Sequence, residues 1–466
     1  MSEFELVVLG GGTGNIVASA AAEEGLDVAL VERGRLGGTC LNRGCNPSKK
    51  LVHAAEVVET VRTAGDHGVD ASLEGVDFEG IVENVEETVR SDAEAKAERA
   101  RDAEALTLYR CEGRFVDERT VEVDTAGPDA ERLTAETVVL AGGSRPTVPD
   151  SIEGTAETEF LTSDDALFLD ERPDRLLVVG GGYIAVEMSY FFSQMGTDVA
   201  IVGHGDVLVD REDPDVADHV TDVYGGRHEL HLGYRATEIA ETDDGKRVTA
   251  EDDDNNEVSV TGDRLLLATG RRPNSDTWNV EAAGIETDDE GFVETNEYLE
   301  TSVDDVYAIG DVAGNYTFKH SGDKEAEYVV DAVVHGEETP VEYPGMAHAI
   351  FGSPQVAGLG DTEDDLEGEA GEDYRVGTCG YHDTALGETL NHEGGFAKVL
   401  VDPDGEVLGC HVVGPDASTL IHEVSTALAA GADAETIAET IHVHPALSEV
   451  VQAAFRDAVD VASSGI

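Results

Sequence analysis

Two glycine-rich segments constrain this chain more than any other feature of its sequence. The first, "VVLGGGTGN" at residues 7–15, precedes a helical stretch that reaches Glu24 and a further apolar run, "DVALVE". The second, "VVGGGYIAVE" at residues 178–187, repeats this order before "DVAIVG". A strand that turns through glycine into a helix presents backbone N–H groups and the positive end of the helix dipole to a phosphate. We therefore expect two dinucleotide-binding units.

Individual positions of the first motif have separate tasks. Gly10 permits the tight turn, and Gly12 lets the backbone approach a pyrophosphate. Glu32 lies about 20 residues further on, where a carboxylate accepts hydrogen bonds from an adenosine ribose. Asn15 occupies the usual place of the third glycine, which weakens the match. The second motif fills its three positions with Gly180, Gly182 and Ala185.

A second repeated phrase indicates an internal duplication. The segments "VVLAGGSRP" (138–146) and "LLLATGRRP" (265–273) are each an apolar strand that ends in small residues and Arg-Pro. From residue 344 the pattern changes, because "GGFAKVLVDPDGEVLGCHVVG" predicts two strands joined by a turn, and helical segments follow. The sequence thus predicts an α/β fold with two Rossmann-like dinucleotide-binding domains and a C-terminal α+β domain.

The charge of the chain restricts its environment and its partners. It carries 99 acidic against 30 basic residues, a formal net charge of −69. At ~1 M salt the screening length falls to about 3 Å, which would quench most repulsion between exposed carboxylates. We therefore expect a salt-adapted protein of a halophile that does not bind nucleic acid, since such binding needs a basic face. No apolar run is long enough for a membrane span, and we expect a cytoplasmic protein.

Two of the five cysteines, Cys40 and Cys45, lie close together in "GGTCLNRGCNPSKK". In an ideal helix, residues five apart have Cα atoms roughly 8–9 Å apart, whereas a disulfide needs less than ~7 Å. A bridge therefore requires distorted backbone, which Gly44 and Pro47 permit. The alternatives are a buried, inert pair or half of a zinc site, although the sequence has no second close Cys/His pair of zinc-finger spacing.

Residues 37–49 and the two glycine motifs together resemble the flavin-dependent pyridine nucleotide-disulfide oxidoreductases. This family includes glutathione reductase, dihydrolipoamide dehydrogenase, mycothione reductase and mercuric reductase, and the resemblance extends from residue 4 to about 460. It implies an FAD-binding domain at 1–150, an NAD(P)-binding domain at 151–272, a central segment at 273–343 that returns to the FAD domain, and a C-terminal interface domain at 344–466. It also implies a homodimer with an active site shared between subunits.

The resemblance assigns roles to the cysteine pair and its neighbours. Cys45 would face the flavin as a thiolate, and Cys40 would attack the substrate disulfide. Lys49 would lie beside the flavin, paired with Glu187, and its charge would favour the thiolate. Lys50 is expected to remain solvated.

A histidine near the C-terminus completes the implied catalytic set. His444, in "IHVHPALSEV", would come from the partner subunit to protonate the leaving thiol, and Glu449 would orient it. His442 is a neighbour of the same type without that role. The other cysteines, Cys111, Cys379 and Cys410, are expected to be small buried hydrophobes.

Further residues are expected to contact the two cofactors. The FAD contacts are Gly10, Gly12, Gly14, Glu32, Gly38, Thr39, Lys49, Gly142, Gly310 and Asp311. The contacts with the nicotinamide nucleotide are Gly180, Gly182, Tyr183, Gly203, His204 and Gly270. An NAD enzyme places Asp or Glu at the end of the strand "DVAIVG", where this chain has Gly203 and His204, so NADPH is favoured over NADH.

We therefore expect an NADPH-dependent flavoprotein that reduces a low-molecular-weight thiol disulfide through a redox-active Cys40–Cys45 pair. The salt-adapted composition favours bis-γ-glutamylcystine, and Arg43, a cation between the two cysteines, suits a substrate with carboxylates, unless it is only a surface charge. Asn46 stands, like Arg43, where relatives usually have apolar residues. The alternatives are an NAD-dependent dihydrolipoamide dehydrogenase and, from another class, a flavin-free metal-binding scaffold.

Overall fold

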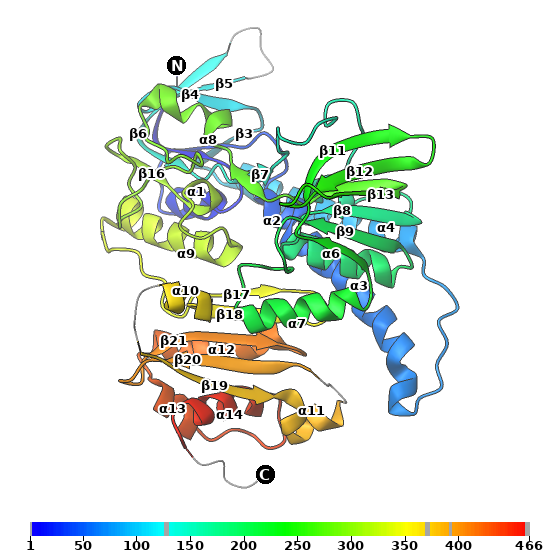
Figure 1. The fold of residues 1–466 in the computed structure, drawn as a ribbon. Coiled ribbons are helices and arrows are strands. Elements are labelled where there is room, and N and C mark those ends of the chain that lie inside the picture. The colour runs from blue at the N-terminus through cyan, green and yellow to red at the C-terminus, as the bar shows by residue number, and fades with distance from the viewer. Residues whose placement is uncertain (1, 125–129, 369–372, 391–393, 462–466) are drawn as a thin grey trace.

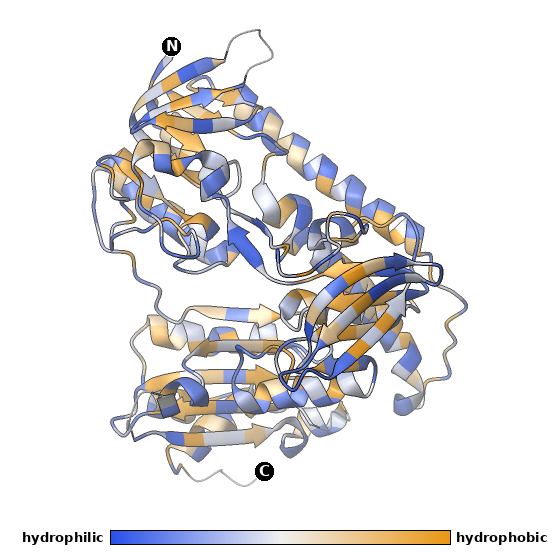
Figure 2. Cartoon of the chain, turned by 45° about the horizontal axis from the view of Figure 1, so that its top comes forward, coloured by the Kyte–Doolittle hydropathy of each residue, from blue (hydrophilic) through white to orange (hydrophobic). Residues whose placement is uncertain are grey.

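The computed structural model describes residues 2–124, 130–368, 373–390 and 394–461. It contains five sheets, which form three units that Figure 1 separates by colour. Blue, cyan and yellow-green segments form the first unit, green segments form the second, and the third runs from yellow to red. Hydrophobic residues concentrate on the strands inside each unit (Figure 2).

The first unit is built on a seven-stranded sheet. Its strands run in the order β3-β2-β1-β6-β5-β4, and β16 pairs with β6. Because β1 is buried on both faces at its carboxyl end, Leu6 to Leu9 form a continuous apolar run. The strands are β1 (Ser2–Leu9), β2 (Val28–Val31), β3 (Leu106–Tyr109), β4 (Gly113–Asp117), β5 (Thr120–Val123), β6 (Glu131–Leu140) and β16 (Val306–Ala308).

Helices of the first unit cover this sheet or extend from it. Helix α1 (Gly14–Glu23) joins β1 to β2, as the first glycine motif predicts. The pairing of β16 with β6 brings the segment after residue 273 back to the first sheet, and α9 (Lys319–Val330) packs against α1. The other helices are α2 (Gly38–Arg43), α3 (Cys45–Thr63), α4 (Phe78–Asp102) and α8 (Ser275–Trp278).

The second unit repeats the arrangement around a parallel four-stranded sheet of order β10-β9-β8-β14. Helix α6 (Tyr183–Gln194) follows β8, as the second glycine motif predicts. A separate antiparallel sheet, β11-β12-β13, lies beside it. The bounds are β8 (Arg175–Val179), β9 (Asp198–Gly203), β10 (Glu229–Leu232), β11 (Arg235–Thr242), β12 (Gly245–Glu251), β13 (Glu257–Gly262), β14 (Arg264–Leu267), α5 (Ser163–Ala166) and α7 (Pro214–Gly225).

The repeated Arg-Pro phrases mark the two crossings between these units. Strand β7 (Ser144–Pro146) leaves the first unit, and β15 (Arg271–Pro273) returns to it. The two strands pair antiparallel, with Arg145 opposite Arg272. The chain therefore enters and leaves the second unit through one two-stranded ribbon.

The third unit is an antiparallel sheet with helices, as the sequence predicts for this region. Its order is β17-β18-β21-β20-β19, and the Asp-Pro-Asp-Gly turn joins β20 to β21. The elements are β17 (Ala347–Ile350), β18 (Val356–Gly360), β19 (Arg375–Gly380), β20 (Phe396–Val401), β21 (Val407–Val413), α10 (Glu363–Gly368), α11 (Ala385–Thr389), α12 (Ala417–Ala429), α13 (Ala434–Glu439) and α14 (Glu449–Ala458). None of the described helices is long and apolar enough to cross a membrane.

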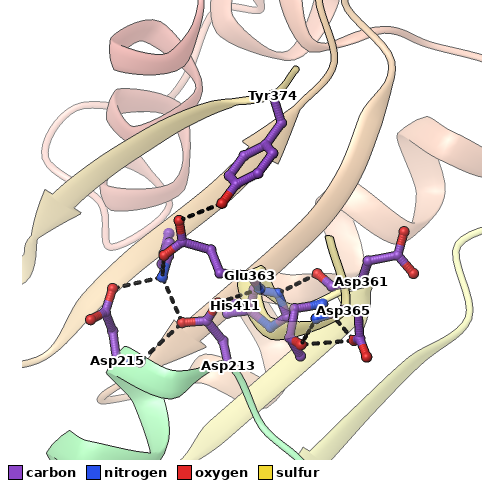
Figure 3. A network of polar contacts seen from close by, with 9 residues as sticks. Asp213, Asp215, Asp361, Glu363, Asp365, Tyr374 and His411 are labelled. Carbon is purple, nitrogen blue, oxygen red and sulfur yellow. Dashed lines mark hydrogen bonds and ion pairs between the residues drawn. The ribbon is translucent and has the colours of Figure 1, made fainter. Parts of the chain in front are cut away.

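Carboxylates of the second and third units, among them Asp213, Asp215 and Glu363, meet in one polar network (Figure 3). Lys398 of β20 is fully buried, and its Nζ donates to Asp213 Oδ1 (2.8 Å) and Asp215 Oδ2 (2.6 Å) at the start of α7. It also donates to Glu363 of α10, whose other oxygen accepts from the Tyr374 hydroxyl. One cation thus holds carboxylates from two units together.

Candidate active site

The two close cysteines lie on either side of a break between two helices. Cys40 is in α2 and Cys45 is the first residue of α3, and Gly44 separates them. A Cβ atom at position 44 would lie 2.9 Å from the Thr39 carbonyl oxygen and 3.3 Å from Cys40 Cα, so only glycine permits this close approach. The backbone therefore departs from a continuous helix at Gly44, as the bridge geometry predicts. Pro47 lies in the first turn of α3, where proline is tolerated.

The two thiols hydrogen-bond each other and differ in acidity. The hydrogen bond from Cys40, with the charge of Lys49, lowers the pKa of Cys45 to about 7, against a raising effect of burial. The same contact and burial raise the pKa of Cys40. The amide oxygen of Asn46 lies 3.8 Å from Cys40 Sγ. Near neutral pH, Cys45 is thus the member of the pair that carries the thiolate.

A lysine and a buried glutamate stand beside Cys45. Lys49 Nζ donates to both oxygens of Glu187, at 2.6 and 2.7 Å. The Phe351 N–H donates to Glu187 Oε1 at 3.0 Å, and the Phe351 ring centre lies 4.5 Å from Lys49 Nζ. Because Glu187 comes from α6 and Phe351 follows β17, the three units meet at this ion pair. Lys50, one position on, points to solvent.

A cavity of about 490 Å³ connects this ion pair with the first glycine motif. It is lined by residues from all parts of the first unit and by the start of α6. The residues expected from the sequence that line it are Gly10, Gly12, Glu32, Gly38, Thr39, Cys40, Cys45, Lys49, Gly142, Tyr183, Glu187, Gly310 and Asp311. Tertiary structure thus brings together residues as far apart in the sequence as Gly10 and Asp311.

Glycines let the backbone segments that line this cavity approach one another closely. Gly10 has φ +105°, and a Cβ there would lie 2.1 Å from the Ala141 carbonyl oxygen. A Cβ on Gly38 would lie 2.6 Å from Gly12 Cα. Glu32 accepts hydrogen bonds from the N–H groups of Gly11 (2.8 Å) and Gly34 (2.7 Å), which fix its carboxylate at the cavity wall with lone pairs to spare. These features fit the predicted FAD site.

Gly14 does not line the cavity but packs α1 against the sheet. A Cβ at this position would lie 2.8 Å from both Val8 Cγ1 and Ala141 Cβ. Close helix–strand packing is the task of the third glycine in the usual motif. Gly14, one position before Asn15, therefore provides the close packing between helix and strand. This explains how the first motif tolerates asparagine at the position of the third glycine.

Asp311 is held at the cavity by residues that the sequence reasoning missed. The Ser144 hydroxyl donates to Asp311 Oδ2 at 2.5 Å, and Arg271 donates to Ser144 Oγ (2.8 Å) and to its carbonyl oxygen (2.9 Å). Burial raises the pKa of Asp311, and the Ser144 hydrogen bond opposes that effect. Ser144 and Arg271 belong to the repeated phrases "GSRP" and "GRRP". The sequence therefore marks both residues as parts of a repeat, but it does not indicate that they contact Asp311.

The cavity is basic although the chain is strongly acidic. Its basic side chains are Arg33, Arg35, Arg43, Lys49, Arg271 and Lys319. Its acidic side chains are Glu32, Glu112, Glu187 and Asp311. The lining thus has a small excess of cations in a protein with a net charge of −69, which favours anionic ligands.

The second glycine motif lies apart from this lining except for Tyr183 and the residues that follow it. Gly180 has φ +125°, and a Cβ at this position would lie 2.2 Å from the Ala268 carbonyl oxygen. Gly182, before α6, faces open space. Gly203 ends β9 and His204, which follows it, is exposed. These residues and Gly270, with φ +95° and open space around it, do not line the cavity.

The predicted histidine–glutamate pair is formed within the third unit. His444 Nδ1 lies 2.9 Å from Glu449 Oε1, and Glu449 Oε2 accepts from the Ala446 N–H at 2.9 Å. Burial raises the pKa of Glu449, but the hydrogen bonds from His444 and Ala446 hold it below its usual range. His444 is 58% exposed and does not line the cavity of its own chain.

Apolar side chains surround this exposed histidine. Ile441 is 96% exposed and Val443 is 76% exposed. Both residues are close to His444 in the sequence. His442, in contrast, contacts Glu423 at 3.2 Å, which raises its pKa.

Other expectations for single residues are met in part. Arg43 Nε lies 3.0 Å from Asp164 Oδ2, so the cation between the cysteines is paired with a carboxylate of α5. Cys410 is buried, as expected, but Cys111 and Cys379 are only half-buried, so for these two the expectation was wrong. Both lie near the edges of their sheets, next to or within strands that are open on one side. Within the described residues, no group of three or more His, Cys, Asp or Glu side chains could hold a metal ion.

Comparison with known proteins identifies relatives over nearly the whole chain. Residues 4–336 match the family described as pyridine nucleotide-disulphide oxidoreductase, and residues 346–455 match the dimerisation domain of that family. The dihydrolipoyl dehydrogenase 2 of Haloarcula marismortui is 36% identical over 97% of this chain and 95% of its own length. The mycothione reductase of Mycobacterium tuberculosis is 32% identical over 97% of this chain and 98% of its own length.

A solved structure has the same arrangement of units. The Cu(II) complex of the HOCl-induced flavoprotein disulfide reductase RclA from Escherichia coli superposes with a TM-score of 0.86. It is 25% identical to this chain and covers 98% of it and 99% of its own length. The two-motif architecture and the third unit are therefore shared across these proteins.

Proposed function

Because the chain belongs to the pyridine nucleotide-disulphide oxidoreductase family, whose members use FAD and NAD(P)H, we propose that it is an NADPH-dependent reductase of a low-molecular-weight thiol disulfide. The observation that supports this most is the unequal thiol pair in a basic cavity, with Cys45 beside the Lys49–Glu187 ion pair. We favour bis-γ-glutamylcystine as the substrate. The domain limits 1–150, 151–272, 273–343 and 344–466 are part of this proposal.

The cavity residues hold FAD in this proposal, and the second unit binds the nicotinamide nucleotide. Gly10, Gly12 and the start of α1 face the pyrophosphate, Glu32 the adenosine ribose, and Asp311 the flavin end. Bound there, FAD would supply a carrier for the electron pair between NADPH and the Cys40–Cys45 disulfide. Tyr183, 48% exposed at the start of α6, lines the cavity and would cover the nicotinamide pocket.

The thiol pair then performs two exchange steps. Because the pKa of Cys40 is raised, His444 of the partner subunit first takes the proton of the Cys40 thiol. The resulting thiolate attacks one sulfur of the substrate disulfide, which forms a mixed disulfide and releases the first product thiolate. Cys45 attacks Cys40 Sγ, which releases the second product thiolate and restores the Cys40–Cys45 disulfide. The charge of Lys49 lowers the pKa of Cys45 and remains when Cys40 is in the mixed disulfide, so it favours the Cys45 thiolate in this step.

Protonation of the product completes the reaction. His444 of the partner subunit donates a proton to the first leaving thiolate, and Glu449 keeps the ring oriented through Nδ1. Two features support this assignment: His444 lies outside the cavity of its own chain, and exposed Ile441 and Val443 flank it. The dimerisation domain over residues 346–455 provides the homodimer that the step needs.

The preference for NADPH rests on the end of β9. Gly203 and the exposed His204 stand where an NAD enzyme has a carboxylate for the 2′-hydroxyl. The absence of that acid is informative because acids outnumber bases by more than three to one in this chain. A neutral or positive group there accepts a 2′-phosphate.

Dihydrolipoamide dehydrogenase activity with NAD is the second candidate. The 36% identical Haloarcula relative, named as a dihydrolipoyl dehydrogenase, favours it, although the mycothione reductase is nearly as similar. The two candidates differ in the charge of the substrate, because lipoamide is neutral and bis-γ-glutamylcystine carries four carboxylates.

A paired assay distinguishes the two candidates. Oxidation of NADPH and of NADH is measured at molar KCl with bis-γ-glutamylcystine, mycothione, glutathione disulfide and lipoamide. We expect the highest kcat/KM with NADPH and bis-γ-glutamylcystine. Equal or better turnover of lipoamide with NADH would replace the first candidate by the second, and a colourless protein without bound flavin would contradict both.

A further inference from the structure

Two cations of the cavity lie beside Cys40, and neither serves the cysteine chemistry described above. Arg43 is three residues after Cys40 in α2, so both side chains emerge on the same face of that helix. Lys319 is the first residue of α9 and lines the cavity together with Thr39 and Cys40. Cys40 therefore lies next to one cation from its own helix and another from a segment 279 positions away.

From these positions we infer that Arg43 and Lys319 together bind carboxylates on the two sides of the disulfide that Cys40 attacks. This inference rests on the proposed function and assigns it a substrate class, which is a disulfide with a carboxylate near each sulfur. Bis-γ-glutamylcystine has such groups on both halves, whereas lipoamide has none.

Both cations are oriented by carboxylates of the chain itself. Arg43 Nε lies 3.0 Å from Asp164 Oδ2, which orients the guanidinium group. Lys319 pairs with Asp323 one helical turn on, which leaves two of its three N–H donors for a ligand. The side chains are 44% and 34% exposed, so ligand oxygens can reach them.

The start of α9 is held in place by a stack of rings. Phe318, the residue before Lys319, lies flat between His320 and His348, with ring centres 5.5 and 5.7 Å away and interplanar angles of 5° and 4°. His320 Nε2 contacts the Ala347 carbonyl oxygen at 2.8 Å, which ties the stack to the third unit. Lys319 therefore starts from a fixed backbone position.

Electrostatics at Cys40 agree with this placement. The charge of Lys319 lowers the pKa of Cys40, and the charge of Asp323 raises it, so both groups lie within electrostatic range of the reacting sulfur. A ligand carboxylate bound to Lys319 would consequently place its own disulfide near Cys40.

The test compares Lys319→Met and Arg43→Met with the wild-type holoenzyme. Lys324→Met is the matched control, because Lys324 lies on the same helix, pairs with Glu327 at 3.1 Å and does not line the cavity. The substrates are bis-γ-glutamylcystine and its tetramethyl ester, in which the four carboxylates are capped. Steady-state kinetics with NADPH at molar KCl give kcat and KM separately for each.

We expect the ratio of kcat/KM for the acid to that for the ester to fall about tenfold in each Met variant, since each loses a charge-assisted hydrogen bond. The loss should lie in KM, and Lys324→Met should keep the wild-type ratio. An unchanged ratio would overturn the inference. An equal fall of kcat/KM with the acid and with the ester also leaves the ratio unchanged, and in Lys319→Met it would mean that Lys319 acts only on the Cys40 thiol. If the wild type reduces lipoamide with NADH but not the acid disulfide, the proposed function fails and this inference fails with it.

Discussion

Cys45 owes its acidity to neighbours on two different helices. Cys40 reaches it across the Gly44 break, and Lys49 lies one helical turn on in α3. Glu187 holds Lys49 in place, and its carboxylate raises the pKa of Cys45 in turn. The pKa of Cys45 is therefore sensitive to the loss of a single neighbouring charge.

A lysine substitution should shift the titration of Cys45. In Lys49→Met the cation that lowers the pKa of Cys45 is gone, so the pKa should rise from about 7 by about one unit. On acidification, the Cys45 thiolate of the variant is then protonated at a higher pH than that of the wild type. The measurement is the long-wavelength absorbance of the two-electron-reduced holoenzyme as a function of pH.

Lys50→Met serves as the control for that titration. Lys50 is exposed and adjacent in sequence, so its removal should leave the midpoint near 7. A midpoint that is the same in Lys49→Met and the wild type would show that the Cys40 hydrogen bond alone sets the acidity. Cys45→Ser should abolish the band entirely.

His444 should be required for turnover. His444→Gln should lower kcat with the disulfide by about 10²–10⁴-fold, the range for loss of a general acid. Glu449→Gln should cost less, because the ring remains and the glutamine retains one acceptor oxygen, although the negative charge beside Nδ1 is lost. His442→Gln is the matched control and should retain activity within about twofold, and a similar loss in this control would contradict the assignment.

The α2–α3 break is the element on which the thiol pair depends. Helix α2 ends at Arg43 and α3 begins at Cys45, so one residue separates two helix axes. Sequence reasoning predicts that this backbone is distorted, because a regular helix would keep the sulfurs too far apart. Only the structure shows that Gly44 packs against Thr39 and Cys40.

A methyl group at this break should separate the thiols. In Gly44→Ala the new Cβ would lie 2.9 Å from the Thr39 carbonyl oxygen, and overpacking of this kind costs about 1–3 kcal/mol. We expect a lower Tm and slower reduction of disulfide substrate. Gly65→Ala, where no atom lies within 4 Å of the new Cβ, is the control; equal behaviour of the two variants would show that the break tolerates a side chain.

The junction of the second and third units depends on one lysine. Lys398 and Asp213 are both fully buried, so removal of the lysine leaves the buried Asp213 carboxylate without its cation. Lys398→Met should destabilise the protein by about 3–5 kcal/mol, measured by urea unfolding at molar KCl. Asp215→Asn should change the stability much less, because Asp215 is 61% exposed. A Lys398→Met protein as stable as the wild type would mean that the carboxylates accept protons at little cost.

The net charge governs the whole molecule. With −69 charges distributed along the chain, self-repulsion opposes folding until salt screens it. The Tm of the wild type should therefore rise steeply between low and molar KCl. A flat or falling profile in differential scanning calorimetry would contradict the salt-adapted interpretation, and sucrose of equal osmolality controls for solvent exclusion.

Local patterns in the sequence determine much of this protein. Strands, turns and helices are predicted to within a few residues by the two glycine motifs, the repeated Arg-Pro phrases and the Asp-Pro-Asp-Gly turn. These patterns are local, because they reflect backbone conformation and the alternation of apolar side chains. A disulfide between Cys40 and Cys45 likewise requires a break in the helix. The pairs Lys49–Glu187 and His444–Glu449 follow from resemblance to a family, and both pairs are in contact in the structure.

Only the tertiary structure decided which distant residues meet. Ser144 and Arg271 hold Asp311, Lys319 reaches the surroundings of Cys40, and Lys398 joins two units, although no local pattern links these positions. Each contact depends on packing of elements that are far apart in the sequence, and its energy depends on the burial that this packing creates. The sequence by itself therefore determined the helices and strands and the Cys40–Cys45 pair. The fold decided which charged side chains surround that pair.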